Sequence, residues 1–243
     1  MGEYFAKDYQ GGEFILFSPP HLAALVVVLI INLLVVFFGK RLSPRGRQVT
    51  RYALAAILVV NETAWHVWNI VNGQWTIQTM LPLHLCSALV WAGAYMLVTR
   101  SYTIYEYCYF MGIAGAFQAL LTPDAGIYGF PHFRAFQTFI SHGCIILSAI
   151  YMTFVEGYRP TWKSLGRVAI GMNIYMVAVF VFNLIIGSNY LFIAHKPETA
   201  SLIDMLGPWP LYILALEAIG LVCCLILYLP YAIRDRRAAR VTA

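Results

Sequence analysis

Seven long apolar stretches divide this chain of 243 residues and limit what it can fold into. Each is about 17 to 23 residues long, which is enough for a helix to cross a hydrocarbon core of roughly 30 Å. Backbone groups in lipid must find their hydrogen bonds within their own segment, so such stretches fold as helices. The sequence therefore predicts an all-α fold, a polytopic membrane bundle of seven transmembrane helices over residues 22–38, 52–70, 80–98, 104–121, 135–155, 165–187 and 211–233.

The composition leaves no room for a soluble domain beside this bundle. Sixty per cent of the residues are hydrophobic and 11% are charged, and the longest connection is only the stretch 188–210. We therefore expect residues 1–243 to form a single transmembrane domain. All five cysteines lie inside apolar stretches, which argues against a framework of disulfides between loops.

The basic residues predict how the bundle is oriented. Thirteen of the sixteen Lys and Arg residues follow the first, third, fifth and seventh stretches, leaving Lys7, Arg134 and Lys196 on the other side. Short loops rich in Lys and Arg stay in the cytoplasm, so the N-terminus is predicted to be outside and the C-terminus cytoplasmic, in a multi-pass protein of the cell membrane. Because topology accounts for the net charge of +5, we expect no nucleic-acid partner.

Polar residues occur where the third stretch begins. Residues 81–87 read Leu-Pro-Leu-His-Leu-Cys-Ser and place His84 and Cys86 just inside the bilayer. An ionisable group at that depth costs free energy unless it is paired, so it points to a function. Cys86 also lies near a predicted helix N-terminus, where the helix dipole favours a thiolate.

Further polar residues share this depth on other stretches. Glu62 and His66 are one turn apart on the second stretch and project from one face. Together they predict a polar cavity within the bundle, open to the outer side, that binds substrate. The predicted substrate-binding residues are Glu62, His66, His84, Gln118, Asn183, His195 and Glu217.

Cys86 and His142 are the candidate catalytic pair. Counted at about 1.5 Å per residue, Cys86 lies roughly 9 Å below the outer end of its stretch and His142 roughly 10 to 12 Å below that of its own. His84 is two residues from Cys86 and faces away from it, so a base for the thiol must come from another helix. We expect the two side chains to lie within about 4 to 6 Å of each other.

Two other functions remain open at this point. A metal-dependent membrane hydrolase would need three or four convergent ligands, for which Glu62, His66, His84 and His142 are candidates, although we expect no metal and no cofactor. A transporter or binding protein for a small molecule or lipid would use the same polar cavity without a covalent step. A retinal-type receptor is disfavoured because no lysine lies inside any stretch to form a Schiff base.

Several short motifs resemble one family. The chain is similar to the YwaF-like family of bacterial integral membrane proteins, which is related to eukaryotic transmembrane protein 164. The motifs are Leu-Pro-Leu-His-Leu-Cys at 81–86, Leu-Leu-Thr-Pro-Asp at 120–124, Phe-Pro-His-Phe-Arg at 130–134 with Ser-His-Gly at 141–143, and Asn-Tyr at 189–190 followed by His-Lys-Pro-Glu-Thr at 195–199 and Gly-Pro-Trp-Pro at 207–210.

The resemblance implies an activity. The eukaryotic relative is associated with phospholipid acyl transfer through a cysteine, and with a distant group of membrane hydrolases that use threonine and histidine. Carried over, Cys86 matches the cysteine and His142 the histidine. The expected function is thus a thiol acyltransferase or lipid hydrolase acting on phospholipids or lysophospholipids through a Cys86/His142 dyad.

Overall fold

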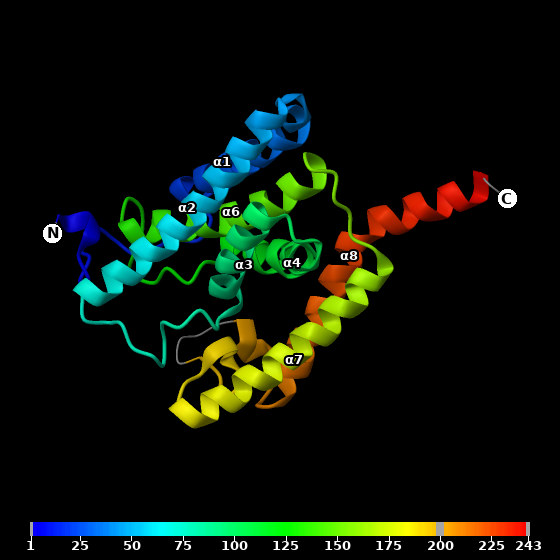
Figure 1. The fold of residues 1–243 in the computed structure, drawn as a ribbon. Coiled ribbons are helices and arrows are strands. Elements are labelled where there is room, and N and C mark those ends of the chain that lie inside the picture. Colours follow the sequence, from blue (N-terminus) through cyan, green and yellow to red (C-terminus); the bar gives the residue numbers. More distant parts are fainter. Residues whose placement is uncertain (1, 198–201, 242–243) are drawn as a thin grey trace. The chain divides into compact units, whose positions relative to one another are not determined.

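The computed structural model describes residues 2–197 and 202–241, and within these it contains helices and connecting segments but no strand (Figure 1). Residues 198–199 of one family motif lie outside the described residues. The α-helices are α1 Pro19–Phe38, α2 Pro44–Val71, α3 Leu85–Thr99, α4 Tyr102–Tyr107, α5 Ile113–Leu121, α6 Phe133–Phe154, α7 Trp162–Ile186 and α8 Leu211–Val241. Short 3-10 helices occupy Glu3–Phe5, Gly39–Arg41, Tyr190–Phe192 and Leu202–Leu206.

Local sequence explains where several helices begin and end. A proline stands in the first turn of both α1 and α2, where its missing N–H costs nothing. The Ser43 hydroxyl accepts a hydrogen bond from Gly46 N at 3.1 Å, and Thr161 and Ser164 form a reciprocal capping box at the start of α7. Gly187 ends α7 with a φ of +67°, a conformation that glycine adopts without strain.

Five helical segments are long and apolar enough to cross a membrane: Pro19–Arg41, Pro44–Val71, Phe133–Phe154, Trp162–Ile186 and Leu211–Arg237. The outer surface of α1 fits lipid rather than water, because large side chains such as Leu29 and Phe37 are more than half exposed. The protein is therefore a multi-pass membrane protein, all-α over the residues described.

The third predicted stretch, 80–98, becomes helical only at Leu85. Before that residue, tyrosine hydroxyls hold the backbone in place of a helical ladder: Leu81 N donates to Tyr190 Oη at 2.8 Å, and Tyr175 Oη donates to Leu83 O at 2.9 Å. The resulting helix has 15 residues and is shorter than the sequence pattern indicates.

The fourth stretch changes helix type partway along. Between α4 and α5, Cys108–Gly112 forms a π-helical turn, so Tyr102–Leu121 is one continuous helix with an interruption in its hydrogen-bond pattern. Cys108 and Phe110 in this turn are fully buried. Gly112 lies against α6, where an added Cβ would be 3.2 Å from Ile145.

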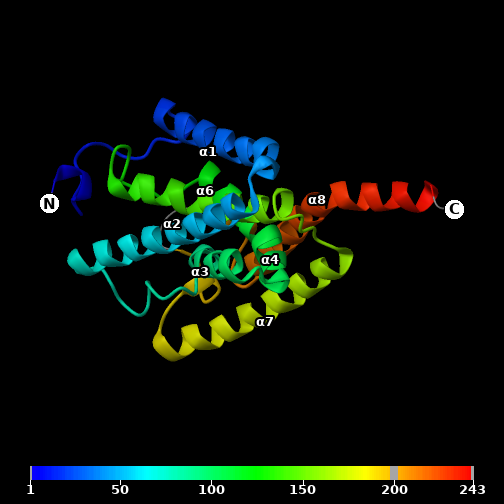
Figure 2. The ribbon, with the colours of Figure 1, turned by 45° about the horizontal axis from the view of Figure 1, so that its top comes forward.

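The chain divides into two compact units, and unit 1 comprises Met1–Trp75 and Cys86–Tyr158. Its centre is α6, the most buried of the five long helices, which packs against α1, α2 and α5. Figure 2 shows α6 lying between α1 and α2. Gly93 of α3 fits closely beside Leu58 of α2 and Ser148 of α6, each 3.4 Å from where a Cβ would stand.

One end of unit 1, which we call the Glu156 end, joins the start of α2 to the end of α3 and the end of α6. Arg51 Nε lies 3.4 Å from Glu156 Oε1, and its Nη1 donates to Leu97 O at 2.7 Å. Arg100 Nη1 lies 3.8 Å from Glu156 Oε2. The Tyr151 hydroxyl donates to Arg47 O at 2.9 Å.

Unit 2 comprises Thr76–Leu85 and Arg159–Ala243. Its helices α7 and α8 pack against each other, and Val179, Tyr190 and Ile193 form a buried cluster beside α7. An exposed bidentate pair joins Arg159 to Asp235, with both oxygens 2.7 Å from Arg159 Nη2.

Candidate functional site

The other end of unit 1, which we call the Arg134 end, is where α2 finishes and where α3 and α6 begin. Cys86 is the second residue of α3 and is half-buried. Its thiol lies within electrostatic reach of the Glu62 carboxylate on α2. The helix dipole at the start of α3 favours a thiolate at Cys86, whereas burial of the thiol and then the nearby carboxylate oppose it.

Glu62 is the buried acid of this end, with 3% of its surface exposed. It forms a hydrogen bond with the Ser87 side chain, and His66 Nε2 lies 3.8 Å from its Oε1. Trp75 Nε1 donates to His66 Nδ1 at 3.0 Å, so the proton of a neutral His66 belongs on Nε2, facing Glu62. Glu62 and His66 therefore do project from one face of α2, as predicted, and Trp75, which the sequence pattern did not single out, orients the His66 ring.

Arg134 lies in the first turn of α6 beside this acid. Its guanidinium carbon lies 4.0 Å from the centre of the Trp65 ring on α2, a cation–π contact. Its Nη1 donates to the side chain of Gln137, and Asn61 Nδ2 donates to the Gln137 backbone oxygen at 3.1 Å. Glu62 and Asp124 lie within electrostatic reach of Arg134.

His142 is eight residues further along α6, about 12 Å deeper along the helix. Its Nδ1 lies 2.8 Å from Thr138 O. A carbonyl accepts, so Nδ1 carries the proton and Nε2 of the neutral ring keeps the lone pair that a base requires. Cys86 and His142 both belong to unit 1, and their predicted separation of about 4 to 6 Å stays a prediction.

The Gln118 side chain forms a hydrogen bond at the C-terminal end of its own helix, α5. Its Nε2 donates to Thr122 Oγ1 at 2.7 Å, and its side chain is exposed at the end of α5. This contact joins α5 to the following turn. The role of Gln118 in substrate binding stays a prediction.

His84 belongs to unit 2 and packs among aromatic rings. Its ring centre is 5.1 Å from that of Tyr190 and 5.1 Å from that of Phe192, and its Nδ1 accepts from Leu191 N at 3.4 Å. These contacts hold the segment before α3 against the loop that follows α7.

Asn183 uses both the nitrogen and the oxygen of its amide to fix that same loop. Its Nδ2 donates to Tyr190 O at 2.9 Å, while its Oδ1 accepts from Ser188 Oγ at 2.7 Å and from Tyr190 N at 2.9 Å. Asn183 is 1% exposed and holds this loop through both amide atoms, and its predicted role in substrate binding stays a prediction.

His195 and Glu217 complete the predicted set, and both lie in unit 2. His195 is exposed, and its Nδ1 lies 2.8 Å from Lys196 O. Glu217 is half-buried on α8, and its side chain makes no hydrogen bond or ion pair with the residues that the structure describes. The predicted polar layer thus draws residues from both units, and its closure into one cavity stays a prediction.

Two further histidines, His21 and His132, fasten loops in unit 1 and are both fully buried. His21 Nδ1 accepts from Phe17 N, and its Nε2 lies 2.9 Å from Leu120 O. His132 Nδ1 accepts from Arg134 N, and its Nε2 lies 3.1 Å from Ala6 O. Each ring donates from one nitrogen and accepts at the other, which requires the neutral form. Burial lowers the pKa of His132, although the hydrogen bond to Ala6 opposes this shift.

The acidic, histidine and cysteine side chains do not gather into a metal site. Within residues 2–197 and 202–241, no three or more His, Cys, Asp or Glu side chains are grouped closely enough to hold an ion. The ligand set considered from the sequence also spans both units, because His84 belongs to unit 2 while Glu62, His66 and His142 belong to unit 1.

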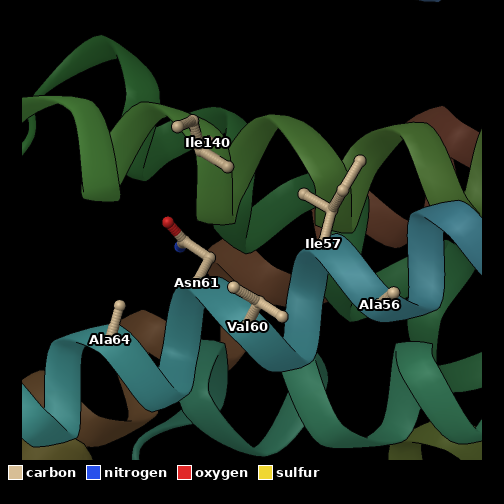
Figure 3. A pocket seen from close by; sticks show the side chains of 6 residues that line it. All are labelled: Ala56, Ile57, Val60, Asn61, Ala64 and Ile140. Atoms are coloured by element: carbon tan, nitrogen blue, oxygen red, sulfur yellow. The ribbon is translucent and has the colours of Figure 1, made fainter.

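An open groove of about 370 Å³ runs between α2 and α6. Figure 3 shows Asn61 on α2 facing the gap below Ile140 on α6, with apolar neighbours on either side. Its lining residues are Ala56, Ile57, Val60, Asn61, Ala64 and Ile140. The Asn61 amide is thus a polar group in an otherwise apolar lining.

Comparison of the sequence with known protein families identifies the family of this chain. The model of the TMEM164 family matches residues 16–228, which include Glu62, Cys86, Arg134 and His142. The chain belongs to the TMEM164 family. An uncharacterized protein of Treponema pallidum (strain Nichols) is 25% identical to this family member over 222 residues, covering 90% of this chain and 91% of the relative. No solved structure matches it. The resemblance inferred from the sequence motifs is confirmed.

Proposed function

We propose that this protein is a membrane-embedded thiol enzyme that removes an acyl group from a phospholipid and passes it to a lysophospholipid or to water. Cys86 is the nucleophile and His142 the base. The observation that carries this proposal is the hydrogen bond from His142 Nδ1 to Thr138 O, because it leaves the lone pair on Nε2. A histidine of unit 1 that was held in the opposite tautomer, like His21, would be a donor rather than a base at Nε2.

The reaction proceeds in two steps, transfer of the acyl group to Cys86 and transfer from Cys86 to the acceptor. In the first, His142 Nε2 takes the thiol proton, the Cys86 sulfur adds to the ester carbonyl, and the C–O bond breaks as the lysolipid oxygen takes the proton from His142. A thioester on Cys86 remains. In the second, His142 removes a proton from the acceptor hydroxyl or water, that oxygen adds to the thioester, and the thiolate leaves and regains the proton.

We also propose the topology in which this reaction occurs. Seven helical segments cross the cell membrane, with Tyr102–Leu121 counted as one and α3 as another, the N-terminus outside and the C-terminus cytoplasmic. Support comes from the sequence, in which 13 of the 16 basic residues follow the first, third, fifth and seventh apolar stretches. The Arg134 end then faces outward.

A tag placed after Ala243 tests this orientation. Reaction of the tag with an impermeant reagent on intact cells would overturn it.

Intact-mass measurement after incubation with a phospholipid tests the chemistry. The wild-type protein should gain the mass of one acyl chain, and Cys86→Ala and His142→Ala should gain none while still expressing and folding. Cys144→Ala is the matched control, since it removes a thiol two residues from His142 and should acylate normally. Full acylation activity in Cys86→Ser would contradict a thiol mechanism, because a serine hydroxyl is far less ionised.

A lipid-binding or transport protein is the second candidate, and the groove between α2 and α6 favours it. Such a protein would bind phospholipid with no covalent change in mass. Equal behaviour of wild-type and Cys86→Ala protein in lipid binding, with no acyl adduct on either, would place this candidate first.

A further inference from the structure

Arg134 is a cation whose protein contacts leave most of its hydrogen-bonding capacity unused. A guanidinium carries five N–H donors in a planar fork. Among the residues that the structure describes, Arg134 makes one side-chain hydrogen bond, to Gln137, and has no carboxylate within 4.0 Å. Glu62 and Asp124 attract it only through space. Several of its donors are therefore available to a ligand.

Trp65 and Gln137 restrain the position of this cation. The guanidinium carbon lies 4.0 Å from the centre of the Trp65 ring, and the hydrogen bond to Gln137 fixes its rotation. The N–H donors of a guanidinium lie at its edge, so a ring against its face leaves them available to other groups. A planar fork held in this way suits the paired oxygens of a phosphate, which arginine binds through parallel hydrogen bonds.

Gln137 links the groove between α2 and α6 to this cation, because its backbone oxygen accepts from Asn61, which lines the groove, and its side chain accepts from Arg134. Along α2, the lining residues of the groove extend from Ala64, next to Trp65, back to Ala56, a rise of about 12 Å. Val60 is 66% exposed and Ile57 is 43% exposed, although both are apolar. In a membrane protein such a surface faces hydrocarbon, and the small Ala56 and Ala64 side chains leave the space between the helices open.

We propose that the Arg134–Trp65 stack and the α2–α6 groove together form a binding subsite for one glycerophospholipid, with its phosphate on Arg134 and one acyl chain along Ala64, Val60 and Ile57. A cation at the interface and an apolar groove below it match the two halves of that molecule. This inference rests on the proposed function and identifies where the substrate is held.

The subsite sets the depth at which the ester bond of a bound phospholipid would lie. The ester of a phospholipid lies between its phosphate and its acyl chain, and therefore between the level of Arg134 and the level of Ile140. Ile140 lines the groove two residues before His142 on α6. Arg134 is thus a substrate-positioning residue. His142 lies about 200° around α6 from Ile140, so it is near this depth but on another face of the helix, outside the groove.

Lipid binding to the full-length Cys86→Ala protein in detergent tests this subsite without interference from turnover. The probe is 1-palmitoyl-2-oleoyl phosphatidylglycerol, with occupancy measured by native mass spectrometry. Arg134→Gln should weaken the first binding event by about tenfold, and Arg134→Lys by less, because the charge remains but the fork is lost. Arg45→Gln removes an exposed cation from the other end of α2 and should leave binding unchanged.

The groove half of the proposal has its own variant. Ala64→Phe should fill the groove next to Trp65 and weaken binding of the phospholipid. Glycerol phosphate, which has the phosphate but no acyl chain, should compete weakly with the phospholipid for Arg134. That competition should be the same in Ala64→Phe as in the parent protein. Trp65→Leu removes the stack without removing the charge and serves if Arg134→Gln does not fold. Unchanged lipid affinity in both Arg134→Gln and Trp65→Leu would overturn the subsite.

Failure of the lipid subsite can be distinguished from failure of the proposed thiol mechanism. Labelling of Cys86 by a small soluble thiol reagent should proceed in Arg134→Gln as in wild type, because that reagent does not need the subsite. Normal Arg134-dependent lipid binding with no acyl adduct on Cys86 would refute the thiol mechanism and keep the subsite. An acyl adduct that forms with the same lipid dependence in Arg134→Gln as in wild type would refute the subsite and keep the mechanism.

Discussion

The two ends of unit 1 use similar residues in opposite ways. At the Glu156 end, one carboxylate lies between Arg51 and Arg100, and Arg51 also donates to Leu97 O. At the Arg134 end, the cation is stacked on Trp65 with most of its donors unused, and the acid Glu62 lies beside a thiol. Charges that pair with one another hold helices together, whereas a charge that the fold leaves underused can bind something else.

The largest expected effect is on the paired end. Glu156→Gln removes the charge beside Arg51, which is only 6% exposed, and should lower the free energy of unfolding by roughly 3 to 5 kcal/mol. Thermal unfolding in detergent measures it. Asp235→Asn in the exposed pair with Arg159 is the control and should cost less than about 1 kcal/mol. Equal losses in the two variants would remove the distinction between a buried and an exposed pair.

A single hydrogen bond at the same end gives a smaller effect. Tyr151→Phe removes the donor to Arg47 O and should lower the free energy of unfolding by about 1 kcal/mol. Thermal unfolding should show this loss without any change in the labelling rate of Cys86. A variant as stable as wild type would mean that this contact between α6 and α2 contributes little.

At the Arg134 end, removing a charge should alter reactivity more than stability. Glu62→Gln leaves a group that can still bond Ser87 and His66, but it takes away the carboxylate that opposes a thiolate at Cys86. Alkylation of Cys86 by iodoacetamide should therefore become about fivefold faster, equivalent to roughly 1 kcal/mol of repulsion. Cys144 in the same protein is the internal control. Slower alkylation of Cys86 would show that Glu62 assists the thiol instead.

Acid should lower the stability of the Arg134 end through His132. This is the smallest of the expected effects, because His132 is only partly protonated in mild acid. The folded state lowers the pKa of His132, so the unfolded chain binds more protons as the pH falls below about 6.5. The stability that His132 contributes is complete above that pH and is lost progressively below it. The melting temperature should fall between pH 7.5 and 5.5, and by less in His132→Gln, whose amide does not titrate. An identical pH dependence in both proteins would contradict this role for His132.

Helical periodicity and length reveal much of this fold. Each of the seven apolar stretches lies largely or wholly within a helical segment, and the one-turn spacing of Glu62 and His66 brings their side chains together. The start of α3 at Leu85 could not be predicted in this way. It depends on the hydroxyls of Tyr175 and Tyr190, which are about ninety or more residues away along the chain.

The candidate site is less visible in the sequence than the helices. Cys86 and His142 are noticed because they are ionisable groups in apolar stretches. Arg134 is noticed only as a basic residue on the sparsely charged side, since nothing local indicates that Trp65 will lie under it. Conversely, Asn183 has the same polar character as a site residue, yet its amide nitrogen and oxygen both form hydrogen bonds with the turn at Tyr190. Tertiary hydrogen bonding decides which polar groups remain available, and a linear pattern does not contain it.

The π-helical turn Cys108–Gly112 has a consequence for how this chain tolerates change in length. A π-turn holds one residue more than the α-helical turn it replaces. Deleting one residue there converts it into ordinary α-helix, while α4 before it and α5 after it keep the faces they present to α6. Deleting one residue elsewhere in Tyr102–Leu121 rotates everything beyond it by about 100°. Among related chains, single-residue gaps in this helix should therefore gather at 108–112.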